Sequence, residues 1–274
     1  MLGLAAPAAA TGRSHELLTQ GETRIDVVID RPAAGGGPAI VMLPSSQRDS
    51  LDFDDVAARV AQAGFVVLRP QPRGMGRSSG PPPDMTLSTL AGDVALTIER
   101  LAGGARAVVV GHAYGHWVAR VADMNHPRLV RGVVVLGASA KTFPPGMTEA
   151  LAVASDPSQP EAQRIEALEK SMFAPGNDPR SWLDGWHPHL RDAYRRAGQV
   201  PAKDQWFGTT HAPILDLQGA QDPWRPANTR DELKHLLGDK VTVRVIAHAS
   251  HALVPEQPAA VAREIVDWVR TLAP

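Results

Sequence analysis

The sequence contains no cysteine among its 274 residues. Disulfide bonds, thiolate nucleophiles and zinc–thiolate sites are therefore all excluded. The 28 Lys and Arg residues nearly balance the 29 Asp and Glu residues, so the net charge is −1 and no basic surface for nucleic acid or an anionic membrane is expected. No apolar run reaches the roughly 18 residues that a membrane-spanning helix needs. These absences favour a small-molecule substrate as the partner. They do not determine the oligomeric state, and a homodimer is one of the alternatives.

The N-terminal residues differ in composition from the rest of the chain. MLGLAAPAAA is apolar and ends in small residues, as a secretory signal does, but no positive charge precedes it. We expect residues 1–20 to form an N-terminal extension that is either disordered or signal-like. The first alternative, which we favour, is compatible with the cytoplasm, and the second places the protein in the periplasm or outside the cell.

Strand-like and helix-like segments alternate over most of the chain. Apolar runs such as AIVMLP (39–44) and FVVLRP (65–70) are typical of strands buried on both faces, and amphipathic segments separate them. This alternation predicts an α/β fold, a mostly parallel β-sheet flanked by helices. No strand-like run occurs between 139 and 210. We therefore predict a core over 21–138 and 211–274, with a helical cap inserted over 139–210.

The segment AVVVGHAYGHWVAR (107–120) has the pattern of a buried strand, a tight turn and a helix. Gly111 and Gly115 lie two positions on either side of Ala113, and small residues at this spacing allow a sharp strand-to-helix turn. Such a turn points its central side chain over the carboxyl edge of the sheet, where the N-terminus of the helix also faces. Enzymes place a nucleophile on this turn, but the methyl group of Ala113 has no nucleophilic atom.

Two later loops carry an acid and a histidine to the same edge of the predicted sheet. Asp222 follows the strand predicted over 213–219, and His251 follows the last predicted strand. A carboxylate in contact with an imidazole orients the ring and stabilises its cation, as in nucleophile–histidine–acid triads. Taken alone, Asp222 is better explained as a residue that begins a turn before proline, and His248 competes with His251.

Four blocks of the sequence resemble the blocks of the α/β-hydrolase superfamily with a helical cap, and they occur in the same order. VVLRPQPRGMGRSSGP is similar to the family's block after its fourth strand, and VVVGHAYGHWVARVADMNHP to its nucleophile elbow. LQGAQDPWRP is similar to its acid loop, and ASHALVPEQP to its histidine loop. The resemblance extends from about residue 22 to the end. It implies an α/β-hydrolase fold with residue 113 at the nucleophile position, and it implies no cofactor and no metal.

The resemblance also assigns the acid and the histidine. It makes Asp222 the acid, and it selects His251 over His248 because Glu256 and Pro258 follow His251 at the spacing of the family block.

The loop LPSSQRD (43–49) stands where the family has its oxyanion loop. We therefore expect the backbone amides of Ser46 and Tyr114 to bind an oxyanion. The cap is rich in aromatic side chains, which is typical of a mostly apolar pocket with a few polar groups. The residues expected to contact the substrate are Ser45, His116, Trp182, Trp186 and His187.

Four positions, in three segments of the chain, depart from the family pattern. Gln71 stands where the family often has Asp, which we interpret as a structural role. Pro44 and Ser45 replace the His-Gly pair of the oxyanion loop, and Ala113 replaces the usual serine.

Three interpretations of Ala113 remain open. In the first, it is an engineered replacement of an active serine, because loss of such a nucleophile costs about a million-fold in turnover and little binding. In the second, it is native, and the His251–Asp222 pair acts as a general base without a covalent step. In the third, the protein is a ligand-binding relative, although such a relative has no need to retain Asp222 and His251.

Two other motifs carry weaker signals. GMGRSSG (74–80) differs in spacing from a dinucleotide-binding loop, and the prolines that follow it leave no helix N-terminus to face a phosphate. The pairs His112/His116 and His187/His189 lack the glutamate or cysteine partners of a zinc site. We therefore expect neither a phosphate-binding loop nor a metal site.

These observations together predict a hydrolase of a small, partly apolar carboxylic ester or lactone. Two alternatives remain. The first is a serine-independent lyase or hydratase, or a cofactor-free oxygenase, that uses the His251–Asp222 dyad as a general base. The second is a non-catalytic small-molecule binding protein.

Overall fold

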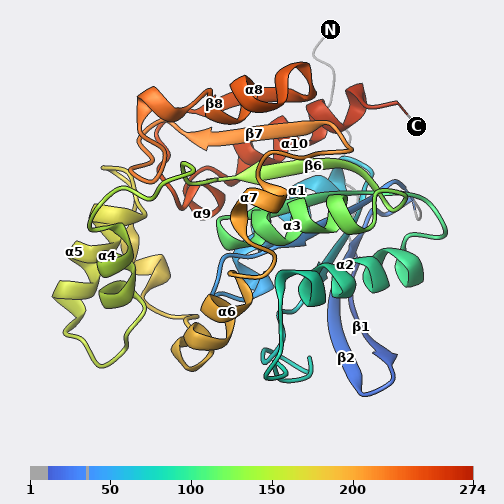
Figure 1. Ribbon diagram of the computed structural model, residues 1–274, viewed down its shortest axis with the longest axis horizontal. Coiled ribbons are helices and arrows are strands. Elements are labelled where there is room, and N and C mark those ends of the chain that lie inside the picture. The colour runs from blue at the N-terminus through green and yellow to red at the C-terminus, as the bar shows by residue number, and fades with distance from the viewer. Residues whose placement is uncertain (1–11, 35–36, 274) are drawn as a thin grey trace, which may run out of the picture.

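The computed structural model describes residues 12–34 and 37–273, in which the strands form one mostly parallel sheet (Figure 1). The strands are β1 (Gly12–Gln20), β2 (Thr23–Arg31), β3 (Ala39–Leu43), β4 (Val66–Pro70), β5 (Ala107–His112), β6 (Val130–Leu136), β7 (Ile214–Gly219) and β8 (Val241–Ile246). Their order in the sheet is β1-β2-β4-β3-β5-β6-β7-β8. Strand β2 is antiparallel to β1 and β4, and the other neighbouring pairs are parallel. The predicted fold class is confirmed.

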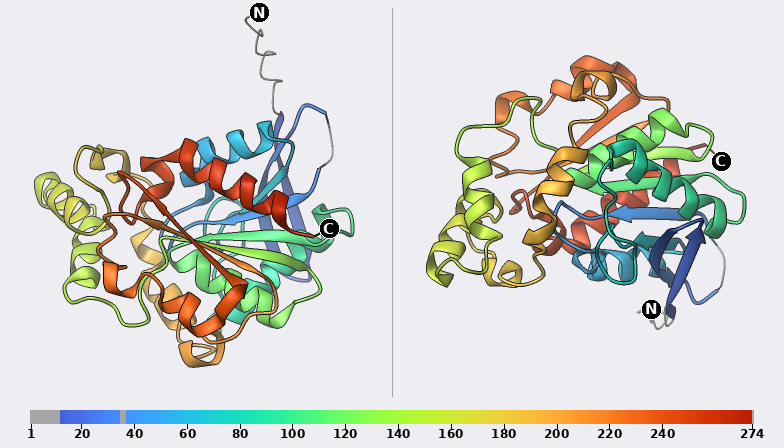
Figure 2. Two further views of the ribbon diagram at one scale, coloured as in Figure 1. Left: turned by 90° about the horizontal axis from the view of Figure 1, so that it is seen from above. Right: turned by 60° about the horizontal axis from the view of Figure 1, so that its bottom comes forward.

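Helices cover both faces of this sheet (Figure 2). One face carries α1 (Asp54–Gln62), α9 (Leu253–Glu256) and α10 (Pro258–Thr271), and the other carries α2 (Leu87–Leu101), α3 (Tyr114–Asn125) and α8 (Glu232–Leu237). Successive residues of β5 alternate between the two layers, because Val108 and Val110 belong to the core under α1 and α10 and Val109 belongs to the core under α2 and α3. Burial on both faces explains why the parallel strands are continuous apolar runs.

Strand β1 corrects the expected N-terminal boundary. Residues 1–20 were expected to lie outside the core, but Gly12–Gln20 pairs with β2 along its whole length. Only Leu18 of this edge strand is buried, so its sequence lacks the hydrophobic pattern that identifies a strand. The rest of the expected extension, residues 1–11, lies outside the described residues. None of the helices in the described ranges is long and apolar enough to cross a membrane.

The chain between β6 and β7 is helical and packs at the carboxyl end of the parallel strands (Figure 1). It contains α4 (Met147–Ala154), α5 (Glu161–Ser171), α6 (Arg191–Ala197) and α7 (Lys203–Trp206), with short 3-10 helices at Pro179–Trp182 and Pro188–Leu190. This segment corresponds to the residues predicted as the cap. Its apolar side chains, among them Phe173 and Trp182, form one cluster with Trp224 and Ala252 of the core. The cap is therefore anchored to the loops that follow β7 and β8.

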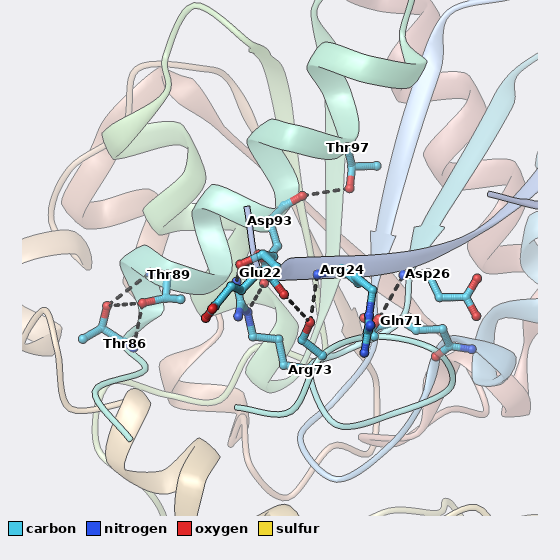
Figure 3. A network of polar contacts seen from close by, with 12 residues as sticks. Glu22, Arg24, Asp26, Gln71, Arg73, Thr86, Thr89, Asp93 and Thr97 are labelled. Atoms are coloured by element: carbon cyan, nitrogen blue, oxygen red, sulfur yellow. Dashed lines mark hydrogen bonds and ion pairs between the residues drawn. The ribbon is translucent and has the colours of Figure 1, made fainter. Parts of the chain in front are cut away.

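The loop after β4, which contains GMGRSSG, is held by its own polar side chains (Figure 3). The amide of Arg24 in β2 donates to Ser79 Oγ at 2.8 Å, which continues the pairing of β2 beyond the end of β4. Gln71 is buried, and its Oε1 accepts a hydrogen bond from the Ser50 amide at 3.2 Å. These contacts agree with the structural role inferred for Gln71.

Candidate active site

Ala113 occupies a strained turn between β5 and α3. Its φ is 46° and its ψ is −116°, a conformation that costs a residue with a side chain about 1–3 kcal/mol. The Ala113 amide donates to the Leu136 carbonyl at 2.9 Å, which ties the turn to β6. A Cβ atom on Gly111 would lie 2.3 Å from the Gly115 carbonyl, and one on Gly115 would lie 2.4 Å from the Leu43 carbonyl oxygen. The turn therefore keeps the geometry of a nucleophile elbow, with a methyl group at its tip.

Replacing Gly115 by alanine should lower the free energy of unfolding by about 1–3 kcal/mol, the usual cost of overpacking. The new Cβ meets the backbone oxygens of Leu43 and Pro44 at 2.4 and 2.6 Å, and neither oxygen can rotate away. Gly92 in α2 provides a matched control, because nothing lies within 4 Å of its added Cβ. Gly92→Ala should stabilise the protein by about 0.5–1 kcal/mol. Urea titration measures both variants, and a loss equal in the two would contradict the close approach.

His251 and Asp222 form a buried pair at the ends of β8 and β7. The Nδ1 atom of His251 lies 3.0 Å from Asp222 Oδ2 and 3.2 Å from Oδ1. The His251 residue is 4% exposed, and the side chain of Asp222 is fully buried. Asp222 Oδ1 also accepts the Trp224 amide at 2.8 Å, which fixes the carboxylate. A carboxylate on Nδ1 selects the tautomer that leaves Nε2 as the proton acceptor.

His112, the residue before the elbow tip, supports the same loop from behind. Its Nε2 lies 2.8 Å from the His251 carbonyl oxygen. Complete burial lowers the pKa of His112 to about 3, so its ring is neutral and its Nε2–H donates to that carbonyl. The contact holds the backbone of His251 against the strand that carries Ala113.

One cavity of about 120 Å³ joins the expected catalytic residues. Ala113 and His251 line it, together with Ser45, Ser46 and Tyr114. Within the described residues, the amides of Ser46 and Tyr114 donate no hydrogen bond to another group. The amide of Tyr114 is free because it begins helix α3, whose first N–H groups have no partner inside the helix. Two residues with unpaired amides thus line the same small space as the oriented imidazole.

The walls of this cavity are apolar and come from residues that sequence reasoning did not select. They include Trp117 of α3, Phe143 and Leu151 of the cap, and Trp224 beside Asp222. Trp117 lies one helical turn after the elbow, so its position had a signal in the sequence. The cap residues had none, because which aromatic side chain faces the cavity depends on how the cap packs.

Four of the five residues expected to contact the substrate, His116, Trp182, Trp186 and His187, do not line this cavity. Only Ser45 does. His116 is 3% exposed, and its ring packs edge-on to Trp206 with 6.3 Å between centroids. Burial lowers the pKa of His116 well below its usual value, so the ring is a neutral component of the core.

Trp182, Trp186 and His187 attach the cap to the core. The guanidinium of Arg48 lies over the rings of Trp182 and Trp186, at 4.5 and 4.8 Å from their centroids. The His187 amide donates to the Gln47 carbonyl at 2.9 Å. These residues hold the cap against the loop after β3, the loop that also carries Ser46.

Glu256 connects the histidine loop to the cap. Its carboxylate accepts the amides of Ser250 and Ala174, each at 2.6 Å, and the side-chain amide of Asn177 at 2.9 Å. Burial and the nearby charge of Asp222 raise the pKa of Glu256 to about 7, although these donors oppose the shift. The glutamate of the family block thus positions the backbone directly before His251.

In the described ranges, no group of three or more His, Asp or Glu side chains is arranged to hold a metal ion. The site thus consists of a His–Asp pair, free amides and apolar walls.

A family model described as "Alpha/beta hydrolase family" matches residues 40–264. The chain belongs to the alpha/beta hydrolase family. The resemblance carried by the four sequence blocks is thereby confirmed. Epoxide hydrolase B of Mycobacterium tuberculosis is 33% identical over 122 residues, which cover 44% of this chain and 34% of that protein. The chain thus matches only about a third of the length of this relative.

Two solved structures share nearly the whole fold. Cfl2 of Burkholderia cenocepacia is 25% identical, with a TM-score of 0.71 over 94% of this chain and 96% of that one. The 2-hydroxy-6-oxo-6-phenylhexa-2,4-dienoate hydrolase of Rhodococcus is 17% identical, with a TM-score of 0.74 over 96% of this chain and 100% of that one. At these identities the likeness to the Rhodococcus hydrolase concerns the fold alone.

Proposed function

We propose that this alpha/beta hydrolase cleaves a small, partly apolar carboxylic ester or lactone with water as the nucleophile. The observation that carries the proposal is the buried contact between His251 and Asp222 in a cavity whose elbow tip is the methyl group of Ala113. A covalent acyl intermediate on residue 113 is chemically impossible in this chain. Because Ala113 and His251 line the same cavity, we expect a water molecule to lie beside the methyl group and to donate to the imidazole.

The reaction then proceeds in two steps that the site residues support. His251 Nε2 takes a proton from water as the water oxygen attacks the substrate carbonyl, and the carbonyl oxygen becomes an oxyanion. The amides of Ser46 and Tyr114 bind that oxyanion, and Asp222 stabilises the imidazolium. The tetrahedral intermediate collapses, the C–O bond to the leaving group breaks, and His251 returns the proton to the departing alkoxide.

The apolar walls support a substrate with an apolar body. Trp117, Phe143 and Trp224 surround the space around the elbow, so an alkyl or aryl group buries its surface there. A purely binding role offers no reason to bury Asp222, since a buried carboxylate costs free energy unless a partner compensates it.

The test compares the unmodified chain with His251→Ala on 4-nitrophenyl esters, lactones and styrene oxide. We expect hydrolysis of an ester or a lactone, a loss of about 10²–10⁴-fold in kcat/KM for His251→Ala, and oxygen from labelled water in the acid product. His248→Asn is the matched control, because His248 is exposed in the same loop and asparagine tolerates its positive φ of 55°. Turnover of the epoxide alone, or hydrolysis that survives His251→Ala, would refute the proposal.

A further inference from the structure

A larger pocket adjoins the catalytic cavity, and Ala113, Asp222 and His251 are not among its lining residues. It has a volume of about 420 Å³ and is lined in part by Trp117, Lys141, Phe143, Lys203 and Trp206. We call it the Lys203 pocket. Trp117 and Phe143 line both spaces, and their rings stack with 6.2 Å between centroids and 17° between planes. The two spaces therefore share the stacked rings of Trp117 and Phe143 along one side.

The ammonium group of Lys203 is surrounded by carbonyls and aromatic rings. Its Nζ donates to the Lys141 carbonyl at 2.8 Å and lies 3.4 Å from the Ala140 carbonyl. The centroids of Phe143 and Phe207 are 5.1 and 5.2 Å from Nζ. An ammonium has three N–H donors, so two carbonyls leave one donor without a partner.

The acidic side chains near Lys203 are committed to other partners. Asp204 pairs with the ammonium of Lys141 at 3.1 Å, and Glu232 accepts the Lys141 amide at 2.8 Å. Within the described part of the chain, no carboxylate lies within 4 Å of Lys203 Nζ. Burial lowers the pKa of Lys203 to about 8 and repulsion from Lys141 and Arg225 adds to the shift, although the more distant carboxylates of Glu232 and Asp204 oppose it. A desolvated charge without a partner is costly, and an anion in the pocket would compensate it.

We propose that the Lys203 pocket binds a carboxylate carried by the substrate, with Lys203 as the residue that selects it. This inference rests on the proposed function and names its substrate class, an ester or lactone with a carboxylate at the end remote from the scissile carbonyl. The apolar part of such a molecule lies along Trp117 and Phe143, because these rings extend from the elbow to the ammonium. Charge-assisted hydrogen bonding to Lys203 then orients the substrate.

Binding separates this inference from turnover. We would titrate the protein with 3-phenylpropionate and with its uncharged amide, 3-phenylpropionamide, by calorimetry at pH 7. The carboxylate should bind at least about ten-fold more tightly than the amide, as expected for a hydrogen bond to a charged group. Lys203→Met should abolish this preference, and Lys203→Arg should retain it. Affinity for the amide should be the same in all three proteins, which shows that the pocket remains folded.

The control variant is Lys170→Met, which removes one positive charge from an exposed position of the cap. It should leave the preference unchanged. Raising the pH above about 8 should weaken carboxylate binding in the unmodified protein, because Lys203 loses its proton there. The other titratable or charged groups that face Lys203 are Lys141, Asp204, Glu232, Arg225 and the neutral His116. Equal binding of the two compounds, binding of neither, or a preference that survives Lys203→Met would overturn the inference.

The two proposals fail in different ways. If the unmodified protein hydrolyses no ester or lactone but still prefers the carboxylate over the amide, the proposed reaction is rejected and the proposed anion site stands. Hydrolysis of 4-nitrophenyl hexanoate and mono-4-nitrophenyl glutarate with equal KM values would keep the reaction and reject the anion site.

Discussion

The Ala113→Ser variant should hydrolyse 4-nitrophenyl esters at least about 10³-fold faster than the unmodified chain, since removing such a nucleophile costs about 10⁶ in kcat in a complete triad. Serine adds one oxygen to a Cβ that already faces the cavity shared with His251. The elbow conformation, with φ at 46°, exists before the substitution, so no backbone change is required. Steady-state kcat/KM and an initial burst of nitrophenol measure the gain.

Two double variants identify the source of that gain. Ala113→Ser combined with His251→Ala should fall to the level of His251→Ala alone, below that of the unmodified chain, because both the serine and water then lack their base. Ala113→Ser combined with His248→Asn should keep the full gain. A fluorophosphonate probe should label only proteins with serine at position 113 and an intact His251. A folded Ala113→Ser protein with neither gain nor label would show that the imidazole does not reach the elbow tip.

Replacing Arg225 by methionine should lower the free energy of unfolding by about 3–5 kcal/mol, the cost of breaking a buried ion pair from one side. Arg225 is 1% exposed, and its guanidinium lies 3.0 Å from Asp216 Oδ2. It also donates to the Ala138 and Ser139 carbonyls, at 3.3 and 3.2 Å. Burial raises the pKa of Asp216 to about 6 even with this cation present. Without Arg225, the Asp216 carboxylate would remain buried and would lose its ion-pair partner.

The loss should be larger at pH 7 than at pH 5, and urea titrations at both values measure it. The pKa of Asp216 is higher in the folded than in the unfolded chain, so its ionisation reduces stability as the pH rises through that interval. Loss of Arg225 raises the folded-state pKa of Asp216 further and so widens the gap from its unfolded-state pKa. The ionised carboxylate then costs more free energy of unfolding at pH 7. The exposed pair Arg195–Asp192, at 3.4 Å, supplies the control, and Arg195→Met should change stability by less than about 0.5 kcal/mol. Equal losses in the two variants would contradict this account.

The sequence by itself determined the fold class and the order of the loops at one sheet edge. Continuous apolar runs separated by amphipathic segments leave few arrangements other than a parallel sheet with helices on both faces. The glycines around Ala113 and the positions of Asp222 and His251 after strands are local features, so they could be predicted without coordinates. Strand β1 could not, because an edge strand with polar side chains on both faces has no hydrophobic pattern.

Only the tertiary structure decided which side chains meet across the cap. Trp182 and Trp186 pack on Arg48, whereas Phe143 lines the cavity at the elbow, although all three are cap aromatics that look alike in the sequence. The environment of Lys203 also combines segments that are distant along the chain. Contacts between such segments depend on the orientation in which the cap packs on the sheet. That orientation cannot be predicted from the composition and residue spacing of any one segment.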